Sequence, residues 1–158
     1  MITQLQFTNF KSWERVSLAF GQVTGIFGTN SSGKTSLIQF LLLLKQTKDT
    51  TDRSTSLELN GSLVELGTIK DAIHKHDESR TIEFKLSFRR KEELVLADPE
   101  KRRGAALTKS HEFSITAGID IHQKAPRARK LTYQVGDMKF SLAPKSRSGK
   151  LLNRMNRL

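Results

Sequence analysis

The first part of the chain alternates hydrophobic and polar residues in a way that predicts β-strands. Residues 2–7 and 16–20 are two such stretches, and the polar residues 9–14 between them predict a turn. Residues 23–27 form a short apolar run between two glycines, which is typical of a buried strand. The chain therefore opens with three expected strands.

A leucine-rich stretch at residues 36–46 has helical length and predicts a helix. Its residues 40–44 are apolar on nearly every side, so we expect the helix to be buried between two sheet layers. Residues 47–56 are rich in Thr, Asp, Lys and Ser and predict a loop.

The second part of the chain predicts an antiparallel sheet, because apolar and polar residues alternate in several short stretches. The expected strands are residues 82–88, 94–96, 113–121, 131–135 and 138–142. Basic loops are expected at residues 89–91, 101–103 and 124–130.

Three shorter elements complete the prediction. Asn60-Gly61 lies between leucine-containing segments and predicts a hairpin with a type I′ turn over residues 57–66. Residues 69–74 predict one or two helical turns. The basic tail from Lys145 onward predicts a short amphipathic helix with apolar positions Leu151, Leu152, Met155 and Leu158.

The motif that carries chemistry is a complete phosphate-binding loop, Gly28-Thr-Asn-Ser-Ser-Gly33-Lys34-Thr35. Its expected setting, after a strand and before a helix, aims backbone N–H groups and the positive end of the helix dipole at an anion. We expect Lys34 to reach the β- and γ-phosphates of ATP and the Thr35 hydroxyl to ligate Mg²⁺. The expected nucleotide-binding residues of the loop are Gly28, Asn30, Ser31, Ser32, Gly33, Lys34, Thr35 and Ser36.

Composition excludes several classes of protein. The chain has 158 residues and no cysteine, which excludes disulfide scaffolds, thiol catalysis and cysteine-ligated zinc. Its longest apolar run is far shorter than the roughly 20 residues of a membrane helix. The N-terminus lacks a signal-peptide pattern. A soluble, cytoplasmic protein without a membrane partner is expected.

Charge is distributed unevenly along the chain. Residues 1–100 carry 13 basic and 13 acidic side chains, whereas residues 101–158 carry 14 basic and 3 acidic ones, which gives the whole net charge of +11. Such a basic end predicts contact with a polyanion, DNA or RNA. The alternative interpretations are a solvated basic face and contact with an acidic lobe. The basic residues concerned are Arg102, Arg103, Lys124, Arg127, Arg129, Lys130, Lys145, Arg147, Lys150, Arg154 and Arg157.

Residues 1–90 resemble the start of an ABC-type ATPase head, in the branch with RecF, the SMC proteins, the OLD family and other AAA-labelled ATPases of bacterial DNA repair and defence. The resemblance rests on the N-terminal segment 2–12, the segment 23–28 and the loop that follows. The segments 41–47, 59–67 and 74–77 resemble a bacterial subgroup, some of whose members pair with a nuclease in anti-phage systems.

The resemblance implies an α/β P-loop fold with an antiparallel β subdomain. It divides the chain into a nucleotide-binding core at 1–50, the β subdomain at 51–143 and a basic tail at 144–158 that leads toward a further lobe. It also implies that Lys11 and Ser12 lie beside the nucleotide and that two heads form a homodimer around ATP. The implied partners are DNA and, as for some members of the subgroup, a nuclease.

The other motifs of a working head are not evident. Asp98-Pro99-Glu100 resembles a Walker B strand end only superficially, and a strand end followed by a turn is the better interpretation. Gln46 is interpreted as a helix-end residue rather than as a magnesium-sensing glutamine. We therefore expect the chain to be one lobe of a longer ATPase and to hydrolyse ATP poorly by itself.

Alternatives remain. His74 and His76 beside Asp77 could bind a metal, but residues two apart do not share a helix face, so hydrogen-bonded or solvent-facing histidines are expected. A non-catalytic module that binds nucleic acid or a nuclease, with a structural ATP site, is the main alternative function. A small P-loop kinase is disfavoured, because no lid arginines or acceptor site are recognisable.

Overall fold

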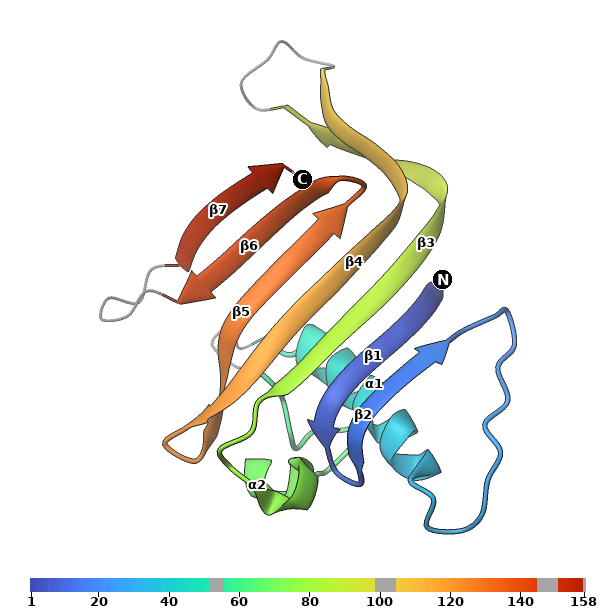
Figure 1. The fold of residues 1–158 in the computed structure, drawn as a ribbon, viewed down its shortest axis with the longest axis vertical. Helices are drawn as coiled ribbons and strands as arrows, with labels where there is room; N and C mark the ends of the chain where they lie inside the picture. Colours follow the sequence, from blue (N-terminus) through green and yellow to red (C-terminus); the bar gives the residue numbers. More distant parts are fainter. Residues whose placement is uncertain (52–55, 99–104, 145–150, 158) are drawn as a thin grey trace.

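The computed structural model describes residues 1–51, 56–98, 105–144 and, by its backbone, 151–157. Seven strands form one antiparallel sheet in the order β2-β1-β3-β4-β5-β6-β7 (Figure 1). The strands are β1 (Ile2–Phe10), β2 (Trp13–Ala19), β3 (Ile82–Ala97), β4 (Ala106–His122), β5 (Ala125–Val135), β6 (Met138–Pro144) and β7 (Leu151–Arg157). The helices are α1 (Lys34–Asp49), α2 (Ile69–Ala72) and the 3-10 helix η1 (His74–His76).

The strand register gives the sheet one apolar and one polar face. Directly paired residues lie on the same face, and Leu5, Leu86, Ile115 and Tyr133 form one such row across β1, β3, β4 and β5. The neighbouring row on the opposite face begins with Gln6 and continues through Lys85, Thr116 and Thr132. This alternation is typical of an antiparallel sheet with one solvated face.

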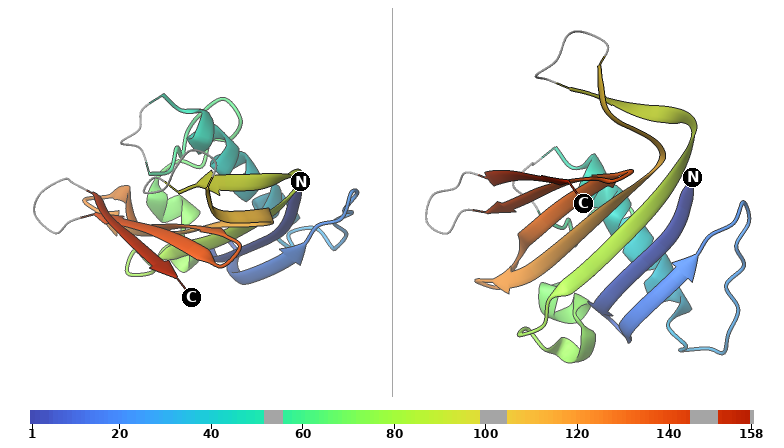
Figure 2. Two further views of the ribbon diagram at one scale, coloured as in Figure 1. Left: turned by 90° about the horizontal axis from the view of Figure 1, so that it is seen from above. Right: turned by 45° about the horizontal axis from the view of Figure 1, so that its top comes forward.

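Helix α1 covers the apolar face over β1 and β3 (Figure 2). Its Phe40 is fully buried and stacks on Phe7 with ring centroids 4.3 Å apart. The rings of Phe10 and Phe84 meet Phe40 edge-on at 4.9 Å and 5.8 Å. The helix packs on a single sheet, with Ile38 51% exposed on its other side, so the expected burial between two sheet layers is wrong.

Residues 56–68, the described part of the segment before α2, extend the core without forming a strand. Among them, Leu57, Leu59, Val64 and Leu66 are buried in the same cluster as Phe40. The predicted hairpin is present as a single bridge between Asn60 and Glu65. Its turn is not type I′, because neither Asn60 nor Gly61 has a positive φ.

The buried strand predicted at residues 23–27 is wrong. The segment has no regular secondary structure and runs beyond the free edge of β2, and the side chains of Val23 and Phe27 are each 94% exposed. A strand forms only where another strand accepts its backbone hydrogen bonds. None of the described strands pairs with this segment.

Most of the other predicted strands are confirmed and prove longer. The stretches 82–88 and 94–96 are joined in β3 across a register shift, which brings the expected loop 89–91 into the strand. The expected loop 124–130 is a tight turn followed by most of β5. The helical turns expected at 69–74 are confirmed, and loop 101–103 lies outside the described residues.

The amphipathic helix predicted near the C-terminus is wrong. Residues Leu151–Arg157 form β7, which pairs with β6 from Met138↔Arg157 to Pro144↔Leu151. The open edge of β6 supplies hydrogen-bond partners that favour a strand over an isolated helix of two turns. Strands from residues 1–50 and from the rest of the chain share one sheet, and the expected boundaries at 50 and 143 stay predictions.

Candidate functional site

The phosphate-binding motif forms an exposed loop that leads directly into α1. Gly33 precedes the helix with φ 86° and ψ 7°, the left-handed conformation that favours glycine, and Ser31 is left-handed as well with φ 64°. The first hydrogen bond of the helix joins the Leu37 N–H to the Gly33 carbonyl. The N–H groups of Lys34, Thr35 and Ser36 therefore lie ahead of the helical ladder, at the positive end of the helix dipole.

The Lys34 side chain turns back over the loop. Its ammonium donates to the carbonyl oxygens of Gly28, at 2.7 Å, and Thr29, and it lies 3.4 Å from Ser32 Oγ. The ammonium thus contacts three oxygen atoms of the loop that precedes α1. Thr35, the expected Mg²⁺ ligand, is exposed on the first turn, and Ser36 is half-buried beside it. The ammonium and N–H donors fit phosphate oxygens, and the Thr35 hydroxyl oxygen fits Mg²⁺.

The turn between β1 and β2 packs against the end of the loop. The indole N–H of Trp13 donates to the Gly33 carbonyl at 3.0 Å. A Cβ placed on Gly33 would lie 2.7 Å from Ser12 Oγ and 2.7 Å from Trp13 Nε1. Ser12 therefore lies beside the loop, and Lys11 precedes it in the same turn. Trp13 was not predicted as a site residue, since its contact joins positions 20 residues apart.

Replacing Gly33 with alanine should disrupt this junction. The new methyl group would clash with Ser12 and Trp13, and alanine would be strained at φ 86°. We expect a loss of about 1–3 kcal/mol in the free energy of unfolding, together with loss of nucleotide binding. Urea unfolding measures the first effect. Gly21→Ala is the matched control, because its Cβ would meet nothing closer than 3.4 Å, and equal losses in both variants would contradict the prediction.

A comparison with protein families agrees with this geometry. The model of the AAA ATPase domain family matches residues 1–148. The chain belongs to the AAA ATPase domain family. No curated protein matches the chain closely enough to be counted as a relative. Within the described residues of this AAA ATPase domain, no helix is both long and apolar enough to cross a membrane.

Gln46 of the AAA ATPase domain lies in the last turn of α1 rather than at the helix end, and its buried side chain holds the 57–66 segment. Its amide nitrogen donates to the carbonyls of Glu58 and Val64, and its oxygen accepts from the N–H groups of Leu63 and Val64. The side chain is 6% exposed. These four bonds use the amide fully and attach the 57–66 segment to α1.

Replacing Gln46 with alanine should destabilise the domain without acting on the loop. The buried Val64 N–H, the Leu63 N–H and the Glu58 carbonyl would lose their Gln46 partner, whereas the Val64 carbonyl keeps its hydrogen bond from the Gly61 N–H. We therefore expect the free energy of unfolding to fall by about 3 kcal/mol. Chemical denaturation would measure this change. Gln39→Ala, at a half-buried position of the same helix, is the control. A Gln46→Ala protein as stable as that control would contradict the stabilising role of the Gln46 hydrogen bonds.

The two histidines are hydrogen-bonded, as predicted. His74 Nδ1 contacts the Lys11 carbonyl at 2.8 Å, and His76 Nδ1 contacts the Lys70 carbonyl at 2.9 Å. Asp77 instead accepts from Ser79 and Arg80. Among the residues that the structure describes, no three metal-ligating side chains gather.

Two carboxyl groups near this segment have lowered pKa values. Hydrogen bonds from the Thr68 hydroxyl and N–H hold the pKa of Asp71 below its ordinary value, and bonds from Ser79 and then Arg80 do the same for the pKa of Asp77. Because the folded pKa lies below the unfolded one, both groups favour folding at neutral pH. That contribution is lost as the pH falls through the lowered pKa.

The predicted strand end at Asp98 is confirmed. β3 ends at Ala97, and the Asp98 N–H donates to the Ala105 carbonyl; Pro99 and Glu100 lie outside the described residues. This end of β3 lies at the far side of the sheet from the start of α1 (Figure 1). Of the basic residues, Lys124, Arg127, Arg129 and Lys130 lie on the β4–β5 turn and β5, and Arg154 and Arg157 belong to β7. Arg102, Arg103, Lys145, Arg147 and Lys150 are outside the described part of the chain.

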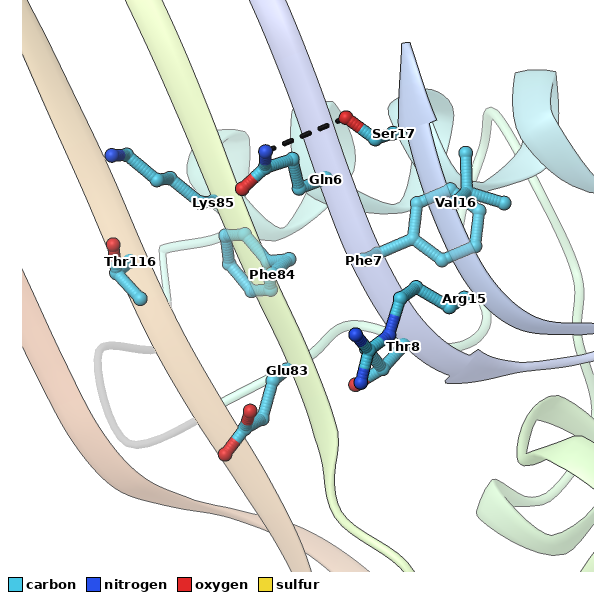
Figure 3. Close-up of a pocket in the computed structure, with 10 residues that line it drawn as sticks. All are labelled: Gln6, Phe7, Thr8, Arg15, Val16, Ser17, Glu83, Phe84, Lys85 and Thr116. Carbon is cyan, nitrogen blue, oxygen red and sulfur yellow. Dashed lines mark hydrogen bonds between the residues drawn. The ribbon is translucent and has the colours of Figure 1, made fainter.

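A separate cavity of about 390 Å³ opens on the solvated face of the sheet (Figure 3). Arg15, Glu83 and Lys85 line it, and Gln6 donates to Ser17 across its edge at 3.4 Å. None of the loop residues contributes to its lining. The cavity is therefore distinct from the loop.

Proposed function

We propose that the chain binds Mg²⁺-ATP at residues 28–36. The observation that supports this most is the Lys34 ammonium, held on loop carbonyls where the 16-residue helix α1 presents its first N–H groups. Phosphate oxygens are stronger acceptors for the same donors. Membership of a family of ATPases supports the same ligand.

Each residue of the loop has a proposed role. Gly28 allows the chain to turn toward the helix, and Gly33 keeps the helix end free of a side chain. Backbone N–H groups of Asn30, Ser31 and Ser32 and of the first helical turn bind phosphate oxygens. Lys34 contacts the β- and γ-phosphates, Thr35 ligates Mg²⁺, and Ser36, Lys11 and Ser12 flank the site. Mg²⁺, when bound, neutralises phosphate charge.

ATP hydrolysis is proposed to need further protein. Within the described residues, no hydrogen bond joins a carboxylate to Lys34 or Thr35, and we propose that the residue that orients the attacking water comes from elsewhere. We propose that the rest of an ABC-type head and a second head in a homodimer supply it. The isolated chain should therefore turn over ATP slowly, and rapid turnover by a pure preparation would overturn this part of the proposal.

DNA is the proposed polyanionic partner, in repair or anti-phage defence, and a nuclease is a further proposed partner. The excess of basic over acidic residues after position 100 supports this, because phosphate contacts dominate nucleic-acid affinity. DNA binding that increases with ATP would support an ATP-driven clamp. Binding that survives Lys34→Ala and needs no ATP would favour the non-catalytic module instead.

Trp13 gives a direct test of the nucleotide site. It is the only tryptophan of the chain, and its indole N–H contacts Gly33 at the loop. Adding Mg²⁺-ATP should change its fluorescence in a saturable way, and Mg²⁺ alone should not. A folded chain whose Trp13 fluorescence does not change when Mg²⁺-ATP is added to millimolar concentrations would contradict the proposed function.

A further inference from the structure

The segment that contains α2 and η1 holds both backbone groups of one residue in the β1–β2 turn. The Lys11 N–H donates to the Ala72 carbonyl at 2.8 Å, and the Lys11 carbonyl lies 2.8 Å from His74 Nδ1. A bridge between Phe10 and Ile73 adds to this contact. His74 is only 8% exposed, so little water competes for its hydrogen bond.

The hydrogen bond acts on a strained part of the turn. Lys11 has φ 49°, in the left-handed region that residues with a side chain rarely adopt. Its carbonyl belongs to the planar peptide that continues into Ser12. By holding this oxygen, His74 fixes the orientation of that peptide and therefore the direction in which the chain enters Ser12 and Trp13.

Ser12 and Trp13 form the surface on which the nucleotide loop rests. Both lie within 2.7 Å of where a Cβ on Gly33 would be, and Trp13 bonds to the Gly33 carbonyl. We propose that His74 is a positioning residue of the nucleotide site, which acts through the Lys11 carbonyl and this turn to hold Gly33 and the start of α1. This inference rests on the proposed function, because it assumes that the loop binds Mg²⁺-ATP.

The chemistry of the contact provides a conservative pair of variants. A carbonyl oxygen only accepts, so His74 Nδ1 must carry a proton. The amide nitrogen of asparagine lies at a similar distance along the side chain as Nδ1 and also donates. Glutamine places its amide one carbon farther out, so it does not reach Lys11 in the same way. His76 offers a matched control in the same segment, because it is exposed and, among the described residues, its side chain is hydrogen-bonded only to the Lys70 carbonyl.

The test uses His74→Ala, His74→Asn, His74→Gln and His76→Ala in the full chain. Three quantities are measured: the melting temperature, quenching of Trp13 by acrylamide without nucleotide, and affinity for Mg²⁺-ATP. His74→Ala and His74→Gln should weaken Mg²⁺-ATP binding about tenfold and expose Trp13 to the quencher. His74→Asn should stay within about threefold of the unmodified affinity, and His76→Ala should match the unmodified chain.

Two results would overturn the proposal. One is a folded His74→Ala or His74→Gln protein with unchanged Trp13 quenching and affinity. The other is an equal loss of affinity for Mg²⁺-ATP in His74→Asn and His74→Gln that is proportional to their loss of melting temperature. That result would mean that His74 only stabilises the fold. If His74→Ala does not fold, the affinity and Trp13 quenching of His74→Asn and His74→Gln still test the proposal. If the unmodified chain fails to bind Mg²⁺-ATP, the proposed function fails, whereas Trp13 quenching still tests the positioning.

Discussion

Replacing Lys34 with alanine is expected to remove measurable Mg²⁺-ATP binding while the fold remains intact. The ammonium is the positive charge that the structure places over the loop carbonyls at the start of α1. Charge-assisted hydrogen bonds contribute more than neutral ones, and Lys34 is expected to make more than one to the phosphates. An affinity loss of about 100-fold or more should follow.

Stability should change little in the same variant. The Lys34 hydrogen bonds join only the loop itself, and alanine is a good helix former at the first helical position. Trp13 fluorescence titrations measure the affinity, and circular dichroism measures the fold. Lys45→Ala is the control, because Lys45 is exposed on the same helix away from the loop. Equal affinities of the two variants would contradict the role of Lys34.

Phe40→Ala is expected to produce the largest loss of stability. Phe40 is fully buried at the centre of an aromatic cluster that joins α1 to β1 and β3. Removing its ring would leave a cavity between Phe7, Phe10 and Phe84, and such substitutions cost about 3–5 kcal/mol in the free energy of unfolding. Because a domain is stable by only about 5–15 kcal/mol, the variant should be close to unfolding.

The control for Phe40→Ala is Ile38→Ala, which removes an exposed apolar side chain two residues earlier in the helix. Urea denaturation of both proteins should show a large shift of the midpoint for Phe40→Ala and a small one for Ile38→Ala. Similar shifts in the two variants would mean that α1 does not pack on the sheet through Phe40.

The features that sequence reasoning predicted well are those set by neighbouring residues. Helix α1 and the alternating strands depend on local periodicity, and Gly33 marks the start of α1. The strand expected before the loop does not form, and nucleotide binding at the loop stays a prediction. The helix still extends three residues beyond the predicted end, to Asp49. There Thr47 Oγ1 donates to the Leu43 carbonyl and accepts from the Glu58 N–H, a contact that no local pattern reveals.

The features that were predicted wrongly depend on distant partners. Residues 23–27 have the composition of a strand, but no strand in the described residues pairs with them. Residues 151–157 have apolar positions compatible with a helix or a strand, and the edge of β6 decides for the strand. Short apolar stretches are ambiguous until their hydrogen-bond partners are known.

The contacts around the candidate site could not be predicted from the sequence either. His74 and Lys11 are 63 positions apart, and Trp13 and Gly33 are 20 apart. Neither pair belongs to a motif with fixed spacing. Resemblance to a family predicts Lys11 and Ser12 beside the nucleotide, whereas the contacts of their turn with Gly33 and His74 required the fold.

Calorimetric titration of Mg²⁺-ATP into the purified chain, beside its Lys34→Ala variant, tests the nucleotide site most directly. We predict a saturable isotherm with one ATP bound per chain, which disappears in the Lys34→Ala protein. A folded chain that releases no heat of binding, or an isotherm unchanged by Lys34→Ala, would contradict nucleotide binding at this loop.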